Sequence, residues 1–84
     1  MMATVIHNDS TVFEFRVLLQ GHSEVTESLS EAIYATCDDA LLVSRNGKTF
    51  VIFDREAASF GSAVKSAIDD LERAGMQVVA VRRL

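Results

Sequence analysis

The side chains best suited to nucleophilic chemistry, one cysteine and two histidines, stand far apart along this chain. His22 follows Gly21, whereas Cys37 is followed directly by two aspartates. A cysteine nucleophile needs a histidine within hydrogen-bonding reach to take its proton. A helix of about ten residues between them, rising about 1.5 Å per residue, would hold the two groups about 15 Å apart. We therefore expect no Cys37–His22 dyad, and the other histidine, His7, precedes the first patterned segment.

Acidic residues gather at two places, Asp38-Asp39 and Asp54-Arg55-Glu56. Clustered carboxylates suit hard cations such as Ca²⁺ or Mg²⁺. Arg55 is, however, a ready ion-pair partner, and acids beside helix ends are ordinary turn residues. We expect no metal ligand, no cofactor and no catalytic residue here, so the sequence favours a protein that is not an enzyme.

Two nucleic-acid or phosphate motifs are incomplete. Residues 20–23 hold one glycine and no Lys or Arg, which argues against a phosphate loop. Residues 46–53 resemble the third-strand motif of RNA-recognition domains. Lys48, however, occupies a position where that motif has an aromatic side chain that stacks on a base, and Glu14 on the first strand would repel the RNA phosphates. With a net charge of −4, we expect this segment not to bind nucleic acid.

Composition indicates one small folded domain. The chain has 84 residues, of which 49% are hydrophobic, and no apolar run approaches the length of about 20 residues needed to cross a membrane. One cysteine cannot form an internal disulfide. We expect a loose leader over residues 1–11, a single domain over residues 12–84, a cytoplasmic location and no membrane contact.

The hydrophobic pattern predicts a strand, a helix and then a hairpin. Apolar residues alternate from Val12 to Leu19, as in a half-buried strand. Thr26 can cap a helix whose inward stripe is Leu29, Ala32, Ile33 and Thr36. Asn46-Gly47 is the sequence of a type I′ turn, which joins residues 40–45 to residues 48–53 and predicts pairs from Arg45–Lys48 to Ala40–Phe53.

A second helix and a last strand follow the hairpin. Ser59 can cap a helix with a strong apolar stripe, and Gly75 can end it in the left-handed conformation. Residues 76–82 then close the sheet, with Val79 and Val81 directed inward.

The order β-α-β-β-α-β predicts an α+β ferredoxin-like sandwich, with an antiparallel sheet in the order 4-1-3-2 and both helices on one face. The opposite face would then carry an apolar patch of Leu18, Leu41, Val43, Phe50 and Ile52. An open sheet face is normally polar, so we expect this patch to be an interaction surface. The alternative is that the hairpin faces are reversed, with Val51 and Phe53 turned to solvent.

Short motifs between residues 26 and 75 resemble an uncharacterised bacterial domain family. They are Thr26-Glu27-x-Leu29, Cys37-Asp38-Asp39-Ala40, Phe53-Asp54-Arg55-Glu56-Ala57 and Ser66-Ala67-Ile68-x-Asp70, followed by Ala74-Gly75. In that family such a domain precedes a helix-turn-helix-like segment, whereas the present sequence stops at Leu84. The resemblance implies a regulatory role, as the N-terminal half of a DNA-binding regulator, and marks Asp38, Asp39, Asp54 and Arg55 as motif positions of unknown role.

These features predict a non-enzymatic interaction or regulatory module that forms a homodimer, or binds another protein domain, through its open sheet face. A small-molecule sensor of the ACT-like kind, with its ligand near Gly21 or at a dimer edge, is the alternative. A small dimeric enzyme that uses one histidine in an apolar cavity is the third hypothesis.

Overall fold

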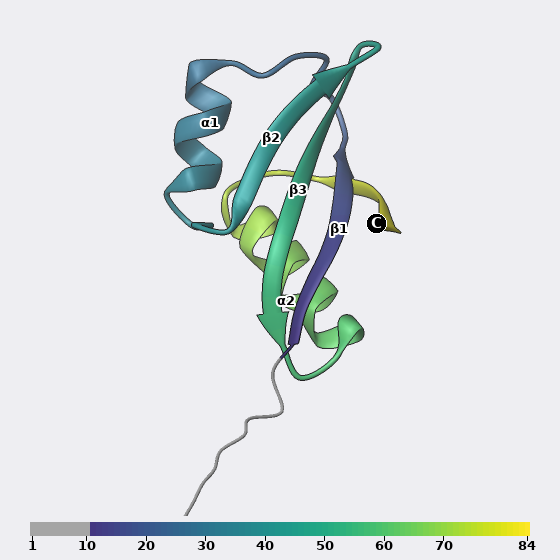
Figure 1. Ribbon diagram of the computed structural model, residues 1–84. Coiled ribbons are helices and arrows are strands. Elements are labelled where there is room, and N and C mark those ends of the chain that lie inside the picture. Colours follow the sequence, from purple (N-terminus) through teal and green to yellow (C-terminus); the bar gives the residue numbers. More distant parts are fainter. Residues whose placement is uncertain (1–10) are drawn as a thin grey trace, which may run out of the picture.

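The computed structural model describes residues 11–84, and His7 lies outside this range. The described chain is an α+β structure with a four-stranded sheet in the order β2-β3-β1-β4, and neighbouring strands are antiparallel (Figure 1). The elements in chain order are β1 (Thr11–Leu19), α1 (Glu27–Tyr34), β2 (Ala40–Arg45), β3 (Lys48–Ala57), α2 (Phe60–Arg73) and β4 (Val78–Arg83).

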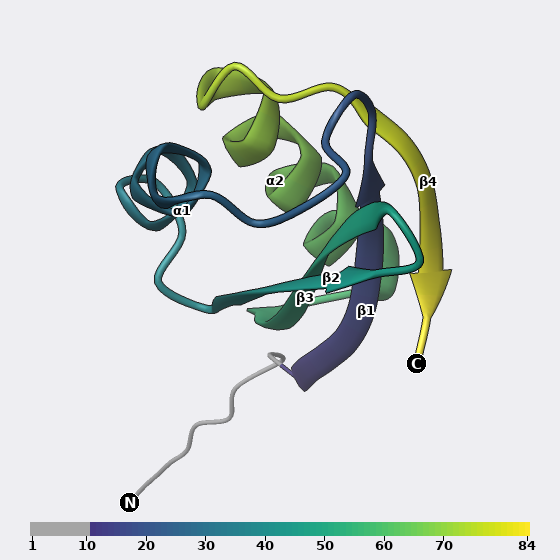
Figure 2. The same ribbon diagram turned by 90° about the horizontal axis from the view of Figure 1, so that it is seen from above.

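Both helices cover the same face of the sheet (Figure 2). One hydrophobic core joins alternate residues of β1 and β3 to the inner sides of α1 and α2. Its largest fully buried side chains include Phe15 and Phe53, whose rings stack with centroids 5.3 Å apart. The predicted face assignment is therefore confirmed, because Val51 and Phe53 are fully buried whereas Phe50 and Ile52 lie on the reverse side.

The β2–β3 hairpin has the predicted turn and register. Asn46 and Gly47 both adopt positive φ, at 54° and 74°, as a type I′ turn requires. The paired residues run from Arg45–Lys48 to Ala40–Phe53. A two-residue loop leaves little freedom for slippage, so this turn determines which side chains of β2 and β3 face the helices.

The helix ends also follow the prediction. The Thr26 hydroxyl oxygen accepts a hydrogen bond from the Leu29 amide nitrogen at 3.2 Å. The Ser59 hydroxyl oxygen accepts one from the Ser62 amide nitrogen at 3.1 Å. Gly75, with φ of 89°, ends the second helix in the left-handed region.

The inward position predicted for Thr36 was wrong. α1 ends at Tyr34, and the Thr36 hydroxyl donates back to the Ile33 carbonyl at 3.2 Å while its side chain stays exposed. Cys37 takes the inward place and is only 2% exposed.

Two strand predictions also differ from the structure. β3 continues to Ala57, four residues beyond the predicted end, because residues 54–57 pair with the first four residues of β1. In β4 a register shift beside Leu18 and Leu19 directs Val78 into the core and leaves Val79 56% exposed. The prediction that Val79 points inward was wrong for this reason, whereas Val81 packs on the core as predicted.

Candidate functional site

The face of the sheet opposite the helices carries two central rows of side chains, one apolar and one half apolar and half arginine, and Figure 1 is viewed from this side. The strand register aligns Val43, Phe50, Leu18 and Ala80 in one row. The next row along the strands is Leu41, Ile52, Arg16 and Arg82. The five residues predicted to form the interaction surface therefore do lie together on one face. Leu41 is 57% exposed and the other four are half-buried.

Phe50 is at the centre of this face. The guanidinium of Arg16 lies over its ring, 4.6 Å from the centroid. Shallow hollows of about 210 and 140 Å³ flank the ring, one toward β4 and the other toward β2. A partly exposed ring with a cation stacked on it offers a partner a broad contact, and little side-chain conformational entropy is lost when the partner binds.

Opposite charges occupy the two ends of the open face. Arg45 and Lys48 lie at the hairpin end, where they line the hollows beside Phe50. At the other end Glu14 pairs in register with Asp54, so that two carboxylates lie side by side. Within residues 11–84 none of these four side chains forms an ion pair.

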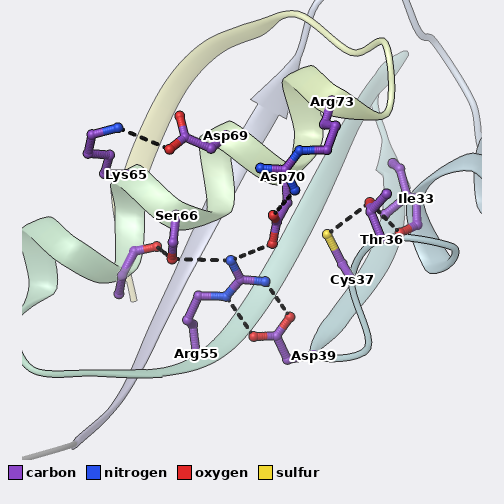
Figure 3. A network of polar contacts seen from close by, with 11 residues as sticks. Ile33, Thr36, Cys37, Asp39, Arg55, Lys65, Ser66, Asp69, Asp70 and Arg73 are labelled. Carbon is purple, nitrogen blue, oxygen red and sulfur yellow. Dashed lines mark hydrogen bonds and ion pairs between the residues drawn. The ribbon is translucent and has the colours of Figure 1, made fainter.

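On the helix side, a polar cluster surrounds Arg55 (Figure 3). Its Nε and Nη2 atoms donate to the two carboxylate oxygens of Asp39, both at 2.8 Å. Its Nη1 donates to Asp70 Oδ2 at 2.9 Å and to Ser66 Oγ at 3.2 Å. Arg73 approaches the other oxygen of Asp70 at 2.9 Å. The cluster joins the start of β2, the end of β3 and the middle of α2. The Arg55 side chain at its centre is only 11% exposed, so most of the solvent is excluded from it.

The electrostatics of this cluster match its geometry. The hydrogen bonds from Arg55 hold the pKa of the Asp39 carboxyl below its ordinary value, against the opposing effect of burial. The hydrogen bonds to Asp39 raise the pKa of Arg55, so the guanidinium stays charged. Four hydrogen bonds from this guanidinium reach three partners, Asp39 just before β2 and Ser66 and Asp70 on α2, in the fork geometry that suits arginine. The arrangement fits a structural clamp rather than a reacting group.

The structure brings together only two of the four motif positions. Asp39 and Arg55 form the ion pair, whereas Asp38 is an exposed bend residue and Asp54 points to the open face beside Glu14. The extension of β3 explains the difference, because consecutive strand residues point to opposite faces. Ser66, Asp70 and Arg73 also belong to the cluster and were not predicted. The spacing of Ser66 and Asp70, four residues apart on one helix face, was the available signal.

Cys37 and His22 lie in different surroundings. Cys37 is buried, and its Sγ contacts the Thr36 hydroxyl at 3.5 Å. His22 instead lines a surface hollow of about 410 Å³ together with Gly47 and Lys48, at the hairpin end. Within residues 11–84, no three His, Cys, Asp or Glu side chains lie close enough to hold a metal ion. Neither described helix is long and apolar enough to cross a membrane.

A scan against known protein families found no match to this chain, and neither did searches of characterised proteins and of solved structures. The resemblance of residues 26–75 to a bacterial family therefore stays a prediction.

Proposed function

We propose that this chain is a ferredoxin-like, non-enzymatic interaction module that pairs with a second copy of itself through the open face of its sheet. The observation that carries this proposal is the pair of central rows around Phe50, which no described element covers. Covering such a face removes apolar side chains from water, which stabilises the pair by about 25 cal/mol per Å² of apolar surface buried. A surface of this kind on a small domain is typical of an interface.

The distribution of charge supports a second copy as the partner. When the axis of a face-to-face two-fold pair lies in the interface and across the strands, each strand of one copy lies antiparallel over the same strand of the other. An axis between the two central rows places the row of Phe50 against the row of Ile52. The same axis places Lys48 of each copy against Asp54 of the other on β3, with Arg45 and Glu14 on the flanking strands of these two rows. Opposite charges then meet at both ends of the interface.

Light scattering during gel filtration tests the association. We expect the molar mass of the full chain to rise with concentration toward that of a dimer. Ile52→Asp puts a charge in the middle of the covered surface and should keep the protein monomeric at every concentration. Val25→Asp is the control, because Val25 is an exposed aliphatic residue in the loop before α1. A wild-type mass that stays monomeric at all concentrations would contradict the proposal.

A charge exchange tests the orientation of the two copies. Lys48→Glu places acid against Asp54 of the other copy, and Asp54→Lys places base against Lys48, so each variant alone should associate weakly. An equimolar mixture of the two variants restores opposite charges at both ends and should form a heterodimer. If the mixture associates no better than either variant, the face-to-face orientation is wrong.

The regulatory role is part of the same proposal. A module that pairs two copies can bring two attached segments to a fixed separation, as dimeric DNA-binding regulators require. The family resemblance of residues 26–75 supports this role.

A small-molecule sensor is the second candidate, favoured by the hollow of about 410 Å³ beside Gly21. Polar groups of Gln20, His22 and Lys48 surround it, as a site for a small anionic or amide ligand would need. A thermal-shift screen with amino acids and nucleotides tests this function, because a ligand at about 100 times its Kd adds about 2.7 kcal/mol of stability.

A further inference from the structure

The apolar stripe of α2 is fully buried along one side and only half-buried along the other. Ala63, Ala67 and Leu71 are fully buried against β1 and β3. Phe60, Val64 and Ile68 lie on the flank of the same helix toward β4 and remain half-buried. The sheet therefore leaves part of the apolar surface of α2 uncovered on the side toward β4.

This flank forms one wall of a groove of about 470 Å³. The other wall is made by Val81 and Arg83, the residues of β4 that point toward the helix layer. Lys65 and Asp69 lie at the rim, where they pair with each other at 3.0 Å. The groove thus has an apolar floor and runs along the outermost strand.

The outer edge of β4 is free to pair. Within residues 11–84, β4 forms a ladder only with β1, and the backbone bonds at its two ends also go to the β1 side, from Gln20 to Gln77 and from Leu84 to Glu14. The opposite edge of the sheet is partly covered. There the Tyr34 hydroxyl accepts the Leu42 amide at 3.3 Å. An uncovered edge strand beside an apolar groove is the arrangement that accepts an added strand.

The groove also carries a charge that lacks an acidic partner. The Arg83 guanidinium lies over the rings of Phe60 and Phe13, 4.8 and 5.6 Å from their centroids. Among the described residues, no carboxylate comes within ion-pair distance of it. A carboxylate brought to this end of the groove would form a charge-assisted hydrogen bond with a donor that the rings already hold in place.

We infer that β4 and α2 together bind an extended peptide as a fifth strand, with a large apolar side chain in the groove and an acidic group at Arg83. The peptide would continue the sheet under the unused flank of α2. This site is distinct from the open face and does not depend on the proposed self-association.

A second copy fits this edge less well than an acidic peptide. If two β4 strands paired about a two-fold axis centred on the strand, Arg83 of each copy would lie opposite Val78 of the other, and β4 contains no acid. Arg83 would then stay without a partner. An apolar segment that also carries a carboxylate satisfies both the groove and the cation.

Selection from a displayed library of random seven-residue peptides, with the full chain as bait, tests the inference. We expect the enriched peptides to alternate apolar and polar residues and to carry an acid at one end of the alternation. A synthetic, fluorescently labelled copy of the most enriched peptide is then titrated by anisotropy. Its binding should slow hydrogen exchange at those amides of residues 78–83 that point away from β1, because the added strand pairs with them.

Paired variants locate the site. Val64→Glu places a charge in the groove and should weaken binding of the selected peptide by at least about tenfold. Its control is Ser62→Glu, on the solvent side of the same helix, which should change the affinity for the peptide by less than about twofold. Arg83→Glu should also weaken it by about tenfold, and Arg82→Glu, on the open face, by less than about twofold. Circular dichroism and the melting temperature establish that each variant is folded.

Three outcomes would overturn the inference. One is a library from which no peptide is enriched. Another is a selected peptide whose affinity is the same for folded Val64→Glu and Arg83→Glu proteins as for the wild type. The third is protection of amides elsewhere than in β4. A dimer that fails to form would leave all of these measurements unaffected, so the two proposals are separable.

Discussion

Replacing Arg55 by methionine removes the central cation of the polar cluster while keeping a side chain of similar length. The change leaves Asp39 without the guanidinium that binds both of its carboxylate oxygens. Asp70 keeps its contact with Arg73. The loss of stability should therefore come mainly from the Asp39 side of the cluster.

The expected magnitude follows from the exposure of the pair. Breaking a buried ion pair by removing one partner costs about 3–5 kcal/mol, whereas an exposed pair contributes about 0–1 kcal/mol. The side chains of Arg55 and Asp39 are 11% and 23% exposed, which lies nearer to the buried case. We expect Arg55→Met to lower the free energy of unfolding by about 2–3 kcal/mol, or the melting temperature by about 10–20 °C in a domain of this size.

Urea unfolding at pH 7, followed by circular dichroism, measures this difference. Lys65→Met is the control, because Lys65 forms an ion pair of similar length with Asp69 but is 78% exposed, and it should cost no more than about 0.5 kcal/mol. Asp39→Asn in both backgrounds completes a double-mutant cycle, in which we expect a coupling energy of at least about 1 kcal/mol. If Arg55→Met costs no more than Lys65→Met, the cluster does not stabilise the fold and the reasoning is refuted.

Three further predictions concern pH, the hairpin and the first helix. The pKa of Asp39 is lower in the folded state than its unfolded value of about 3.9. The ionised carboxylate therefore stabilises the fold above that pH, and this stabilisation is lost as the pH falls through the folded pKa. Asp39→Asn should make the urea midpoint fall less steeply below pH 5 than in the wild type. Gly47→Ala should lower the free energy of unfolding by about 1–2 kcal/mol, because φ at this position is +74°. Gly61→Ala should raise it by about 0.5–1 kcal/mol, because Gly61 lies inside α2 and has no positive φ. Equal effects of the two changes on thermal unfolding would contradict this account. Ile33→Ala should cost about 2–5 kcal/mol in urea unfolding, since Ile33 is fully buried and α1 has only one other buried residue; a loss under about 1 kcal/mol would mean that α1 is not firmly packed.

The parts of the fold that were predicted correctly depend on local chemistry. Asn46-Gly47 requires a particular turn, and that turn determines the hairpin register and the outward position of Phe50. Thr26 and Ser59 are caps because their hydroxyls reach an amide three residues later. Such signals need no knowledge of distant residues, so they can be read from the sequence.

The errors arose where a distant partner decides the outcome. Residues 54–57 are poor strand formers by composition, yet β1 supplies a ladder for them and keeps them extended. Val79 follows the expected alternation only if β1 and β4 pair without a shift, and they do not. The Arg55 cluster needs Asp70 from a helix that could be placed only once the sheet was known. The groove beside β4 depends on how much of the apolar stripe of α2 the sheet covers, which no local pattern contains.

The first strand of this chain is also an inner strand of its sheet, and that order of synthesis has a kinetic consequence. The hairpin can close within microseconds once residues 40–57 exist, since its partners are neighbours in sequence. β1, in contrast, emerges from the ribosome first and must wait for β3 and then for β4 before both of its edges are paired. During translation its apolar side remains uncovered longest of the four strands, and a chaperone that holds nascent chains would meet residues 11–19 before the other three strands of this sheet.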